Sequence, residues 1–280
     1  MDSHTIMTGV LGFPVRHSLS PQMHNKAFQS LQLNFRYGSF SVEPSKLSDA
    51  VRGIRGLGFR GVNVTIPHKV AILPYLDEID QEASLIGAVN TVVNENGRLI
   101  GYNTDGRGYV QSLKEETGIE ITGKKILILG AGGAARAISV SLALEGAEQL
   151  WIANRTPEKG KQLAQSLQSL SKADDISWAE IPSVIQQVAV VVNTTSVGMF
   201  PNIEEIPISP DLLHSNLLVS DLIYNPMETK LLIEAEKRGA SIHKGLGMFI
   251  YQGALAFQLW TGKEAPISLM RETVLQELLK

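Results

Sequence analysis

The sequence predicts an α/β protein of two domains, of which the second contains a doubly wound parallel sheet. Three observations indicate this fold class. The chain has 280 residues, more than most single domains. From Lys124 onward, short apolar runs alternate with helical patterns, as expected for parallel strands that helices cover on both faces. A glycine-rich segment at 130–135 lies directly between the first such strand and its helix, which is typical of the Rossmann-type fold.

The composition excludes several classes of protein. Hydrophobic residues make up 44% of the chain, which is enough for a core without disulfides or metals. The 25 basic and 28 acidic residues give a formal charge of -3, so nothing attracts the whole protein to nucleic acid or to an anionic membrane. The absence of cysteine excludes a thiolate metal site, and we expect no bound metal. Because the chain shows neither a signal-peptide pattern nor an apolar run of roughly 18 residues, we expect a cytoplasmic protein with no membrane partner.

Apolar alternation and turn residues define the elements of the first hundred residues. Strands are predicted at 5–11, 35–42 and 61–66. Between the first two strands, Ser20 is expected to cap a helix that has Pro21 as its first residue. The pair Asn96-Gly97 predicts a hairpin turn. The strands of this hairpin are predicted at 88–93 and 98–103.

The remaining elements alternate regularly. A helix predicted at 105–116, which ends at Gly118, links the first part of the chain to the second. Buried strands are predicted at 126–129, 150–153, 188–193 and 217–222, and a short strand at 241–243. Further helices are predicted at 228–238, 248–260 and 267–279.

The segment 130–135 reads Gly-Ala-Gly-Gly-Ala-Ala and fits the dinucleotide-binding pattern G-x-G-x-x-G/A. Glycines are needed there because the turn is tight and the backbone must approach the pyrophosphate closely. The free N–H groups at the start of the next helix then bind the phosphates. A simple turn is the alternative interpretation, but the preceding strand and the helix that ends near Gly146 favour a cofactor site. The pattern predicts an enzyme that depends on a nicotinamide cofactor.

The end of the second strand favours NADP over NAD. An NAD site usually has an acidic residue there, which binds the ribose 2′-hydroxyl, but this chain has Asn154-Arg155-Thr156. Arg155, together with Arg136 from the first helix, can neutralise a 2′-phosphate through charge-assisted hydrogen bonds. The alternative is that Arg155 is an ordinary solvated arginine. The cofactor contacts expected from the turn and this strand are Gly130, Ala131, Gly132, Gly133, Ala134, Arg136, Asn154, Arg155 and Thr156.

Polar clusters near the ends of the early elements indicate a second binding site. They lie at 18–21, 63–69, 88–91 and 102–105. Several have a structural alternative, since Ser20 can cap a helix, Thr65 favours strands and Asn90 can be a satisfied core amide. Lys69 starts a helix after a buried strand, where a lysine can transfer a proton, although most lysines simply face solvent. Asp105 can hold the Lys69 ammonium in position, or it can cap its own helix.

Taken together, these clusters resemble the shikimate dehydrogenase family over nearly the whole chain. Gly12-Phe13-Pro14 and the segment 18–25 resemble the amino-terminal signature of the family. The other matching motifs follow in the family's order at 63–69, 87–91, 103–105, 130–136, 154–156, 193–199 and 251–253. So many motifs in the same order argue against chance similarity.

The resemblance implies reversible, NADPH-dependent reduction of 3-dehydroshikimate to shikimate. It implies that Lys69 and Asp105 are catalytic, with Lys69 as the proton donor. The substrate carboxylate would be bound by Ser18, Ser20 and Tyr224, and the ring hydroxyls by Thr65, Asn90, Asp105 and Gln252. Further cofactor contacts would be Thr195, Met199, Ile223, Gly245 and Met248.

The resemblance also implies how the chain is organised. We expect a substrate-binding domain at 1–106, a cofactor domain at 107–247 and terminal helices at 248–280 that return to the first domain. The protein is expected to be a monomer or a homodimer. Because the two reactants bind to different domains, we expect these domains to close around them.

Three alternative functions remain to be compared, two enzymes with other substrates and one protein without catalytic activity. A quinate/shikimate dehydrogenase that prefers NAD would be expected to carry an acidic residue beside Arg155, where the strand end has none. Methylenetetrahydrofolate dehydrogenase has a similar architecture, but the serine pair and the ring-hydroxyl ligands favour a small polyhydroxy acid. A binding module without activity has no reason to keep both Lys69 and Asp105.

Overall fold

The computed structural model describes residues 2–280, which form two compact units. The first unit comprises the chain up to Thr104 together with Ile250–Lys280, and the second is Asp105–Phe249. The chain therefore passes from one unit to the other at 104–105 and again within helix α10 (Gly245–Thr261).

The first unit contains a mixed six-stranded sheet with the strand order β2-β1-β3-β5-β6-β4. Its strands are β1 (Ile6–Gly12), β2 (Phe35–Ser41), β3 (Gly61–Val64), β4 (Glu78–Ile79), β5 (Thr91–Glu95) and β6 (Arg98–Tyr102). Its helices are α1 (Ser20–Ser30), α2 (Leu47–Gly56), α3 (His68–Ala71), α4 (Gln81–Ile86), the second half of α10 and α11 (Ile267–Leu278). Because β1 and β3 pair in parallel, their carboxyl ends lie at the same edge of the sheet, and the loops 13–19 and 65–67 follow from this edge.

Close approaches at glycine bind the terminal helices to this sheet. A Cβ on Gly61 would lie 2.3 Å from Trp260 Nε1, and this indole nitrogen donates to Val92 O at 3.1 Å. Gly253 makes similar room for Met23 of α1, whose Cε lies 2.3 Å from the position of a Cβ. Helix α11 also packs against α1. The second half of α10 is therefore part of the first unit's core.

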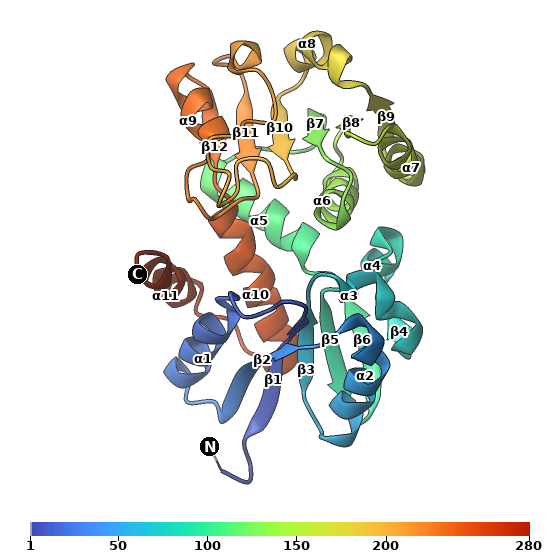
Figure 1. Ribbon diagram of the computed structural model, residues 1–280, viewed down its shortest axis with the longest axis vertical. Helices are drawn as coiled ribbons and strands as arrows, with labels where there is room; N and C mark the ends of the chain where they lie inside the picture. The colour runs from blue at the N-terminus through green and yellow to red at the C-terminus, as the bar shows by residue number, and fades with distance from the viewer. Residues whose placement is uncertain (1) are drawn as a thin grey trace. The chain divides into compact units, whose positions relative to one another are not determined.

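The second unit confirms the predicted doubly wound parallel sheet. Its strands are β7 (Lys125–Leu129), β8 (Gln149–Ala153), β9 (Lys172–Ile176), β10 (Val190–Asn193), β11 (Leu218–Asp221) and β12 (Ser241–His243). Its helices are α5 (Asp105–Thr117), α6 (Gly133–Leu144), α7 (Pro157–Leu167), α8 (Ile181–Val184), α9 (Lys230–Lys237) and the first half of α10. The order is β12-β11-β10-β7-β8-β9, and all pairs are parallel. Helix α7 packs on β8 and β9, and α9 packs on β11 and β12 (Figure 1).

Two predictions about local structure were wrong or incomplete. Leu19, and not Ser20, occupies the cap position of α1, and Ser20 is the first helical residue, with no side-chain cap. Strand β9 was missed because an edge strand is less covered by its neighbours. It reads Lys-Ala-Asp-Asp-Ile instead of a continuous apolar run. None of the helices within residues 2–280 has both the length and the apolarity needed to span a bilayer.

Candidate active site

The first part of the candidate site lies where β1 and β3 end. The backbones of the two following loops meet there, since Phe13 N donates to Ile66 O at 3.0 Å and Thr65 N donates to Leu11 O at 2.9 Å. Glycine is required at position 12, because a Cβ on Gly12 would lie 2.4 Å from Thr65 Cγ2. The predicted ligand Thr65 is thus fixed against the end of β1, with its side chain partly exposed.

Lys69 lies in the short helix α3, directly after this loop. Its carbonyl oxygen accepts a hydrogen bond from Val89 N at 2.8 Å, and Asn90 O accepts one from Val64 N at 2.8 Å. The neighbouring His68 is buried and anchors α3, with its Nε2 2.7 Å from a backbone carbonyl oxygen. These main-chain hydrogen bonds fix the backbones of Lys69 and Asn90 next to each other. The Lys69 side chain is partly exposed.

Asn90 is buried, and both ends of its side-chain amide are hydrogen-bonded. Its Oδ1 accepts from Thr104 N at 2.8 Å and from Thr91 Oγ1 at 2.9 Å, while its Nδ2 donates to Thr104 Oγ1 at 3.0 Å. Thr104 directly precedes Asp105, a buried carboxylate that is the first residue of α5. The segment that leads to Asp105 is therefore held by Asn90.

The serine pair lies at the start of α1, where Ser20 N donates to Ser18 Oγ at 3.3 Å. Two buried residues that the sequence analysis did not single out are Tyr37 and Asn63, and the Tyr37 hydroxyl donates to Asn63 Oδ1 at 2.7 Å. Burial raises the pKa of Tyr37 well above its ordinary value, so its hydroxyl stays protonated. A polar amide inside the apolar strand β3 was the signal that could have identified Asn63.

The other predicted substrate ligands come from both units. Gln252 lies in the first-unit part of α10 and is partly buried. Asp105 and Tyr224 belong to the second unit. Tyr224 is partly buried and stacks on Phe249 with ring centroids 5.0 Å apart. Burial raises the pKa of its hydroxyl, which therefore remains a neutral hydrogen-bond donor.

The glycine turn follows β7 in the second unit. Gly130 has φ of +109°, and a Cβ on it would lie 2.5 Å from Thr194 Oγ1, so two reasons require glycine there. Gly132 and Gly133 are exposed, and a Cβ on either would meet no atom within 4 Å. Gly132 holds the cap position of α6, where no side chain caps the helix. This open, uncapped helix start fits the pyrophosphate of a dinucleotide.

The loop after β8 presents a positive charge. Arg155 is exposed, and Asn154 Nδ2 donates to Thr156 O at 2.8 Å across it. Thr156 occupies the cap position of α7. Ala134 and Arg136 are partly exposed on α6, as is Ala131 in the preceding turn. An exposed arginine without an acidic residue at this strand end fits a 2′-phosphate.

The ends of β10 and β11 are joined by Asp221, which the sequence analysis missed. Its fully buried carboxyl accepts hydrogen bonds from Asn193 Nδ2 at 3.1 Å, Ile223 N at 3.1 Å and Thr229 Oγ1 at 2.7 Å. Burial outweighs these donors and raises the pKa of the carboxyl. Asn193 Oδ1 also accepts from Thr195 Oγ1 at 2.7 Å. One buried carboxyl thus positions both Thr195 and Ile223, two of the predicted cofactor contacts.

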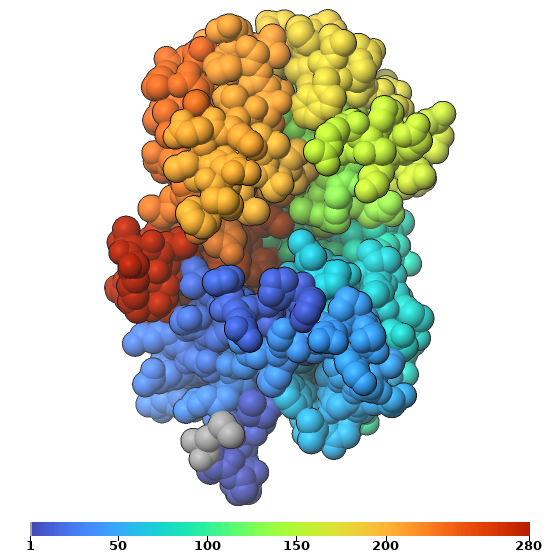
Figure 2. Space-filling model, viewed as in Figure 1, coloured from blue at the N-terminus to red at the C-terminus, as the bar shows by residue number. Residues whose placement is uncertain are grey.

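Three further predicted cofactor contacts lie on the loop after β10 and on α10. Met199 is 45% exposed in a segment that Figure 2 shows, in amber, on the visible surface of the second unit. Gly245 opens α10, and a Cβ on it would lie 2.2 Å from Leu222 O, so a side chain cannot be accommodated. Met248 follows one turn later and is partly buried.

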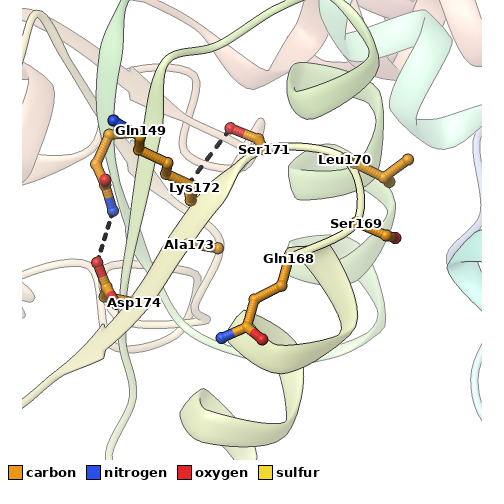
Figure 3. Close-up of a pocket in the computed structure, with 8 residues that line it drawn as sticks. All are labelled: Gln149, Gln168, Ser169, Leu170, Ser171, Lys172, Ala173 and Asp174. Carbon is orange, nitrogen blue, oxygen red and sulfur yellow. Dashed lines mark hydrogen bonds between the residues drawn. The ribbon is translucent and has the colours of Figure 1, made fainter.

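A shallow depression elsewhere on the second unit contains none of the predicted ligands. It is lined by Gln149 and the residues 168–174, at the end of α7 and the edge strand β9. Gln149 Nε2 donates to Asp174 Oδ2 at 2.9 Å across it, as the side chains in Figure 3 show. Its rim carries Lys172 and Asp174, charges that protect an edge strand from pairing. Within residues 2–280, no three His, Asp or Glu side chains gather as a metal site would require.

Family models match three parts of the chain. The shikimate dehydrogenase substrate binding domain matches residues 10–92, and the shikimate / quinate 5-dehydrogenase model matches residues 112–202. The shikimate 5′-dehydrogenase C-terminal domain matches residues 245–275. These three regions cover more than half of the chain and carry most of the predicted ligands.

Individual relatives agree with these models over nearly the full length. The chain is 53% identical to a shikimate dehydrogenase (NADP(+)) of Geobacillus sp. over 269 residues, which are 96% of this chain and 97% of the relative. A crystal structure of a shikimate dehydrogenase in complex with NADP+ has a TM-score of 0.95 and 44% identity, and it covers 100% of this chain and 98% of its own. A Listeria monocytogenes shikimate 5-dehydrogenase in complex with shikimate and NAD has a TM-score of 0.93 and 41% identity, with 98% of each chain covered.

Proposed function

The chain belongs to the shikimate dehydrogenase family, and from this premise we propose that Lys69 and Asp105 are the catalytic side chains of its reaction. The reaction is the reversible, NADP-dependent interconversion of 3-dehydroshikimate and shikimate. The observation that carries the assignment is the pair of main-chain hydrogen bonds that fix the backbones of Lys69 and Asn90 next to each other. The carbonyl oxygen of the proposed proton donor Lys69 accepts from Val89 N, and that of the next residue, the proposed hydroxyl ligand Asn90, accepts from Val64 N of β3.

The cofactor side of the second unit fits NADP. The uncapped start of α6 and the open space at Gly132 and Gly133 accept a pyrophosphate, and Arg155 offers a charge for a 2′-phosphate. The wall formed by Thr195, Met199, Ile223, Gly245 and Met248 would hold the nicotinamide and its ribose. NADPH, when bound, supplies the hydride that reduces the carbonyl carbon of the substrate.

Lys69 would supply the proton. As the carbonyl carbon is reduced, its oxygen gains negative charge, and a positioned ammonium can transfer a proton to it. Asp105 would orient that ammonium and accept a hydrogen bond from the same substrate hydroxyl. In the oxidation of shikimate, Lys69 takes the proton back, so the same pair serves both directions.

The carboxylate of the substrate would be bound by neutral hydroxyl groups, and its ring hydroxyls by both neutral and charged side chains. Hydroxyls of Ser18, Ser20 and Tyr224 can donate hydrogen bonds to the carboxylate without a full positive charge. The ring hydroxyls would be bound by Thr65, Asn90, Asp105 and Gln252. An unpaired buried group costs roughly 1–3 kcal/mol, so this fixed set favours a polyhydroxy acid over less polar ones.

The two units of the chain would then differ mainly in which ligand they bind. We assign most substrate ligands to the first unit, Asp105 and Tyr224 to the second, and NADP to the second, and we propose a cytoplasmic enzyme that is a monomer or a homodimer. Light scattering coupled to size-exclusion chromatography measures the oligomeric state, and a trimer or larger assembly would contradict the proposal.

A direct assay tests the activity. The purified protein is mixed with shikimate and NADP, and the absorbance of NADPH is followed, with NAD and quinate tested in parallel. We expect rapid NADPH formation and a preference for NADP and for shikimate in kcat/KM. A flat trace together with calorimetric binding of both ligands would indicate a binding protein instead. A preference for NAD or quinate would favour a quinate/shikimate dehydrogenase.

A further inference from the structure

The buried carboxyl of Asp221 binds donors from three separate segments of the second unit. Asp221 and Asn193 are partners at the carboxyl ends of the neighbouring strands β11 and β10 (Figure 1). Asp221 Oδ1 accepts from Asn193 Nδ2 and from Ile223 N, each at 3.1 Å, and its Oδ2 accepts from Thr229 Oγ1 at 2.7 Å. The segments that follow both strands are therefore tied to one side chain.

These contacts fix the orientation of the Asn193 side-chain amide. The backbone N–H of Thr195, which can only donate, lies 3.1 Å from one end of this amide. Asp221 Oδ1, which also accepts from the N–H of Ile223, faces the other end. The amide oxygen of Asn193 must therefore face Thr195, and the amide nitrogen must face Asp221.

The Thr195 hydroxyl is consequently occupied within its own loop. Its single proton is donated to Asn193 Oδ1 at 2.7 Å, and its oxygen accepts from Val197 N at 3.1 Å. Its methyl carbon Cγ2 instead lies beside the glycine turn, 3.2 Å from the position that a Cβ on Gly130 would take. Thr195 therefore presents a methyl group to this turn, and not a hydrogen-bond donor.

The segment after β11 is fixed from the same carboxyl. The N–H of Ile223 donates to Asp221, so the backbone of this predicted cofactor contact is anchored. The carbonyl oxygens of Leu222 and Ile223 would lie 2.2 Å and 2.7 Å from a Cβ on Gly245, which is itself a predicted contact. Asp221 therefore acts on residues from three parts of the proposed cofactor wall.

We propose that Asp221 is a positioning residue of the cofactor site, which acts on Thr195 through Asn193 and directly on Ile223. The inference rests on the proposed function, since it takes Thr195 and Ile223 as parts of the wall beside the nicotinamide and its ribose. In this arrangement the Thr195 hydroxyl does not bind the cofactor. It holds the loop after β10, and the methyl group of Thr195 is the part that contacts the dinucleotide.

A double-mutant cycle distinguishes this indirect role from a direct contact. Thr195→Val removes the hydroxyl with little change in shape, and Asp221→Leu removes the carboxyl that holds Asn193. We measure kcat/KM for NADP at saturating shikimate, per site that binds adenosine 2′,5′-bisphosphate in calorimetry. This probe contains the adenosine and the 2′-phosphate but no nicotinamide. Counting sites with it removes the effect of unfolded protein, and its dissociation constant should stay the same in all variants.

The two substitutions should not have independent effects. Because donors are left unpaired, Asp221→Leu should lower kcat/KM for NADP about tenfold or more, and Thr195→Val alone about fivefold. In the Asp221→Leu background, Thr195→Val should lower it less than about twofold, since the hydroxyl no longer holds a fixed loop. The same loss from Thr195→Val in both backgrounds would show that the hydroxyl binds the cofactor directly, and would overturn the inference.

Asp221→Asn is the conservative variant. Its amide oxygen can still accept from Ile223 N and Asn193 Nδ2, while its amide nitrogen would face the Thr229 hydroxyl, which can turn and accept. We therefore expect kcat/KM for NADP within about threefold of the wild type, because the two contacts that act on the wall are kept. A loss as large as that of Asp221→Leu would contradict a role through these hydrogen bonds.

Ser220→Ala is the matched control for a general loss of stability. Ser220 is the buried neighbour of Asp221 on β11, and its hydroxyl is hydrogen-bonded to Tyr109 and His243 instead. Successive side chains of a strand point to opposite faces, so this variant should lower the melting temperature and leave kcat/KM for NADP unchanged. A tenfold loss in this control as well would overturn the inference. A wild-type enzyme that forms no NADPH from shikimate would instead overturn the proposed function, so the two failures are distinguishable.

Discussion

The imidazole of His24 lies parallel to the ring of Tyr37, with an interplanar angle of 5° and the ring centroids 4.5 Å apart. Phe28, Phe257 and Trp260 complete an aromatic surrounding for the histidine. Among the described residues, neither ring nitrogen of His24 has a hydrogen-bond partner. Burial lowers the pKa of His24 from 6.5 to about 3, because the charged ring would lose its hydration without compensation.

This depressed pKa predicts a loss of stability in acid. In the unfolded chain His24 binds a proton below its ordinary pKa of 6.5, whereas the folded protein resists protonation down to about 3. Above pH 6.5, His24 is neutral in both states and does not lower the free energy of unfolding. Below pH 6.5, protonation of the unfolded chain lowers this free energy by about 1.4 kcal/mol per pH unit. We expect the unfolding free energy of the wild type, relative to His24→Phe, to fall by about 2 kcal/mol between pH 7 and pH 5.

Denaturant unfolding at several pH values measures this difference. His24→Phe keeps an aromatic ring and loses no hydrogen bond, so other titrating groups cancel in the comparison. Replacement of the exposed His4 by Gln is the control and should leave the pH dependence of the wild type unchanged. Parallel curves for the wild type and His24→Phe would show that the buried histidine does not contribute.

Of the four edge strands of the two sheets, sequence patterns predicted β2 and β12 but missed β4 and β9. Strands β7 and β10 are mostly continuous apolar runs because neighbours cover them on both sides, whereas the edge strand β9 carries three charges in five residues and was missed. Lys69 and Asn90 became candidate site residues because they lie at the ends of recognisable elements. The carboxyl of Asp221 could not be identified in this way, because its three donors come from separate segments that only the folded sheet brings together.

The glycine turn offers a test that separates folding from cofactor binding. Gly130 needs a positive φ and has Thr194 Oγ1 2.5 Å from the position of a Cβ, so Gly130→Ala should destabilise the folded protein. Gly132 has φ of -82° and open space around it, so Gly132→Ala should fold normally. Its methyl group would nevertheless occupy the space of the pyrophosphate, and we expect the KM for NADP to rise about tenfold or more.

Thermal unfolding without ligands and steady-state kinetics with NADP give the two readouts. For Gly132→Ala we expect an unchanged melting temperature together with the higher KM. Normal NADP kinetics in this variant would mean that the pyrophosphate does not approach the turn.

Arg155 should account for the preference for NADP. Loss of charge-assisted hydrogen bonds to the 2′-phosphate costs roughly 1.5–3 kcal/mol, so Arg155→Ala should lower kcat/KM for NADP about 10- to 100-fold. NAD has no 2′-phosphate, so its kcat/KM should stay within about threefold of the wild type. Arg52→Ala is the control, because Arg52 is an exposed arginine of the first unit that pairs with Asp49 on its own helix. Equal losses with both nucleotides would assign Arg155 a structural role.

Lys69 is the sharpest test of the proposed chemistry. General acid catalysis typically contributes 10²- to 10⁴-fold, so Lys69→Ala should lower kcat by about that factor in both directions of the reaction. The dissociation constant for shikimate, measured by calorimetry, should change by less than about threefold, because the other proposed substrate ligands keep their positions in this variant. Lys26→Ala, which replaces an exposed lysine on α1, should leave both quantities unchanged. Added methylamine should restore part of the lost kcat, since it supplies a proton donor of the same kind. If Lys69→Ala kept near-normal turnover, the proton would have to come from another group, and the assignment of Asp105 as its orienting partner would fail with it.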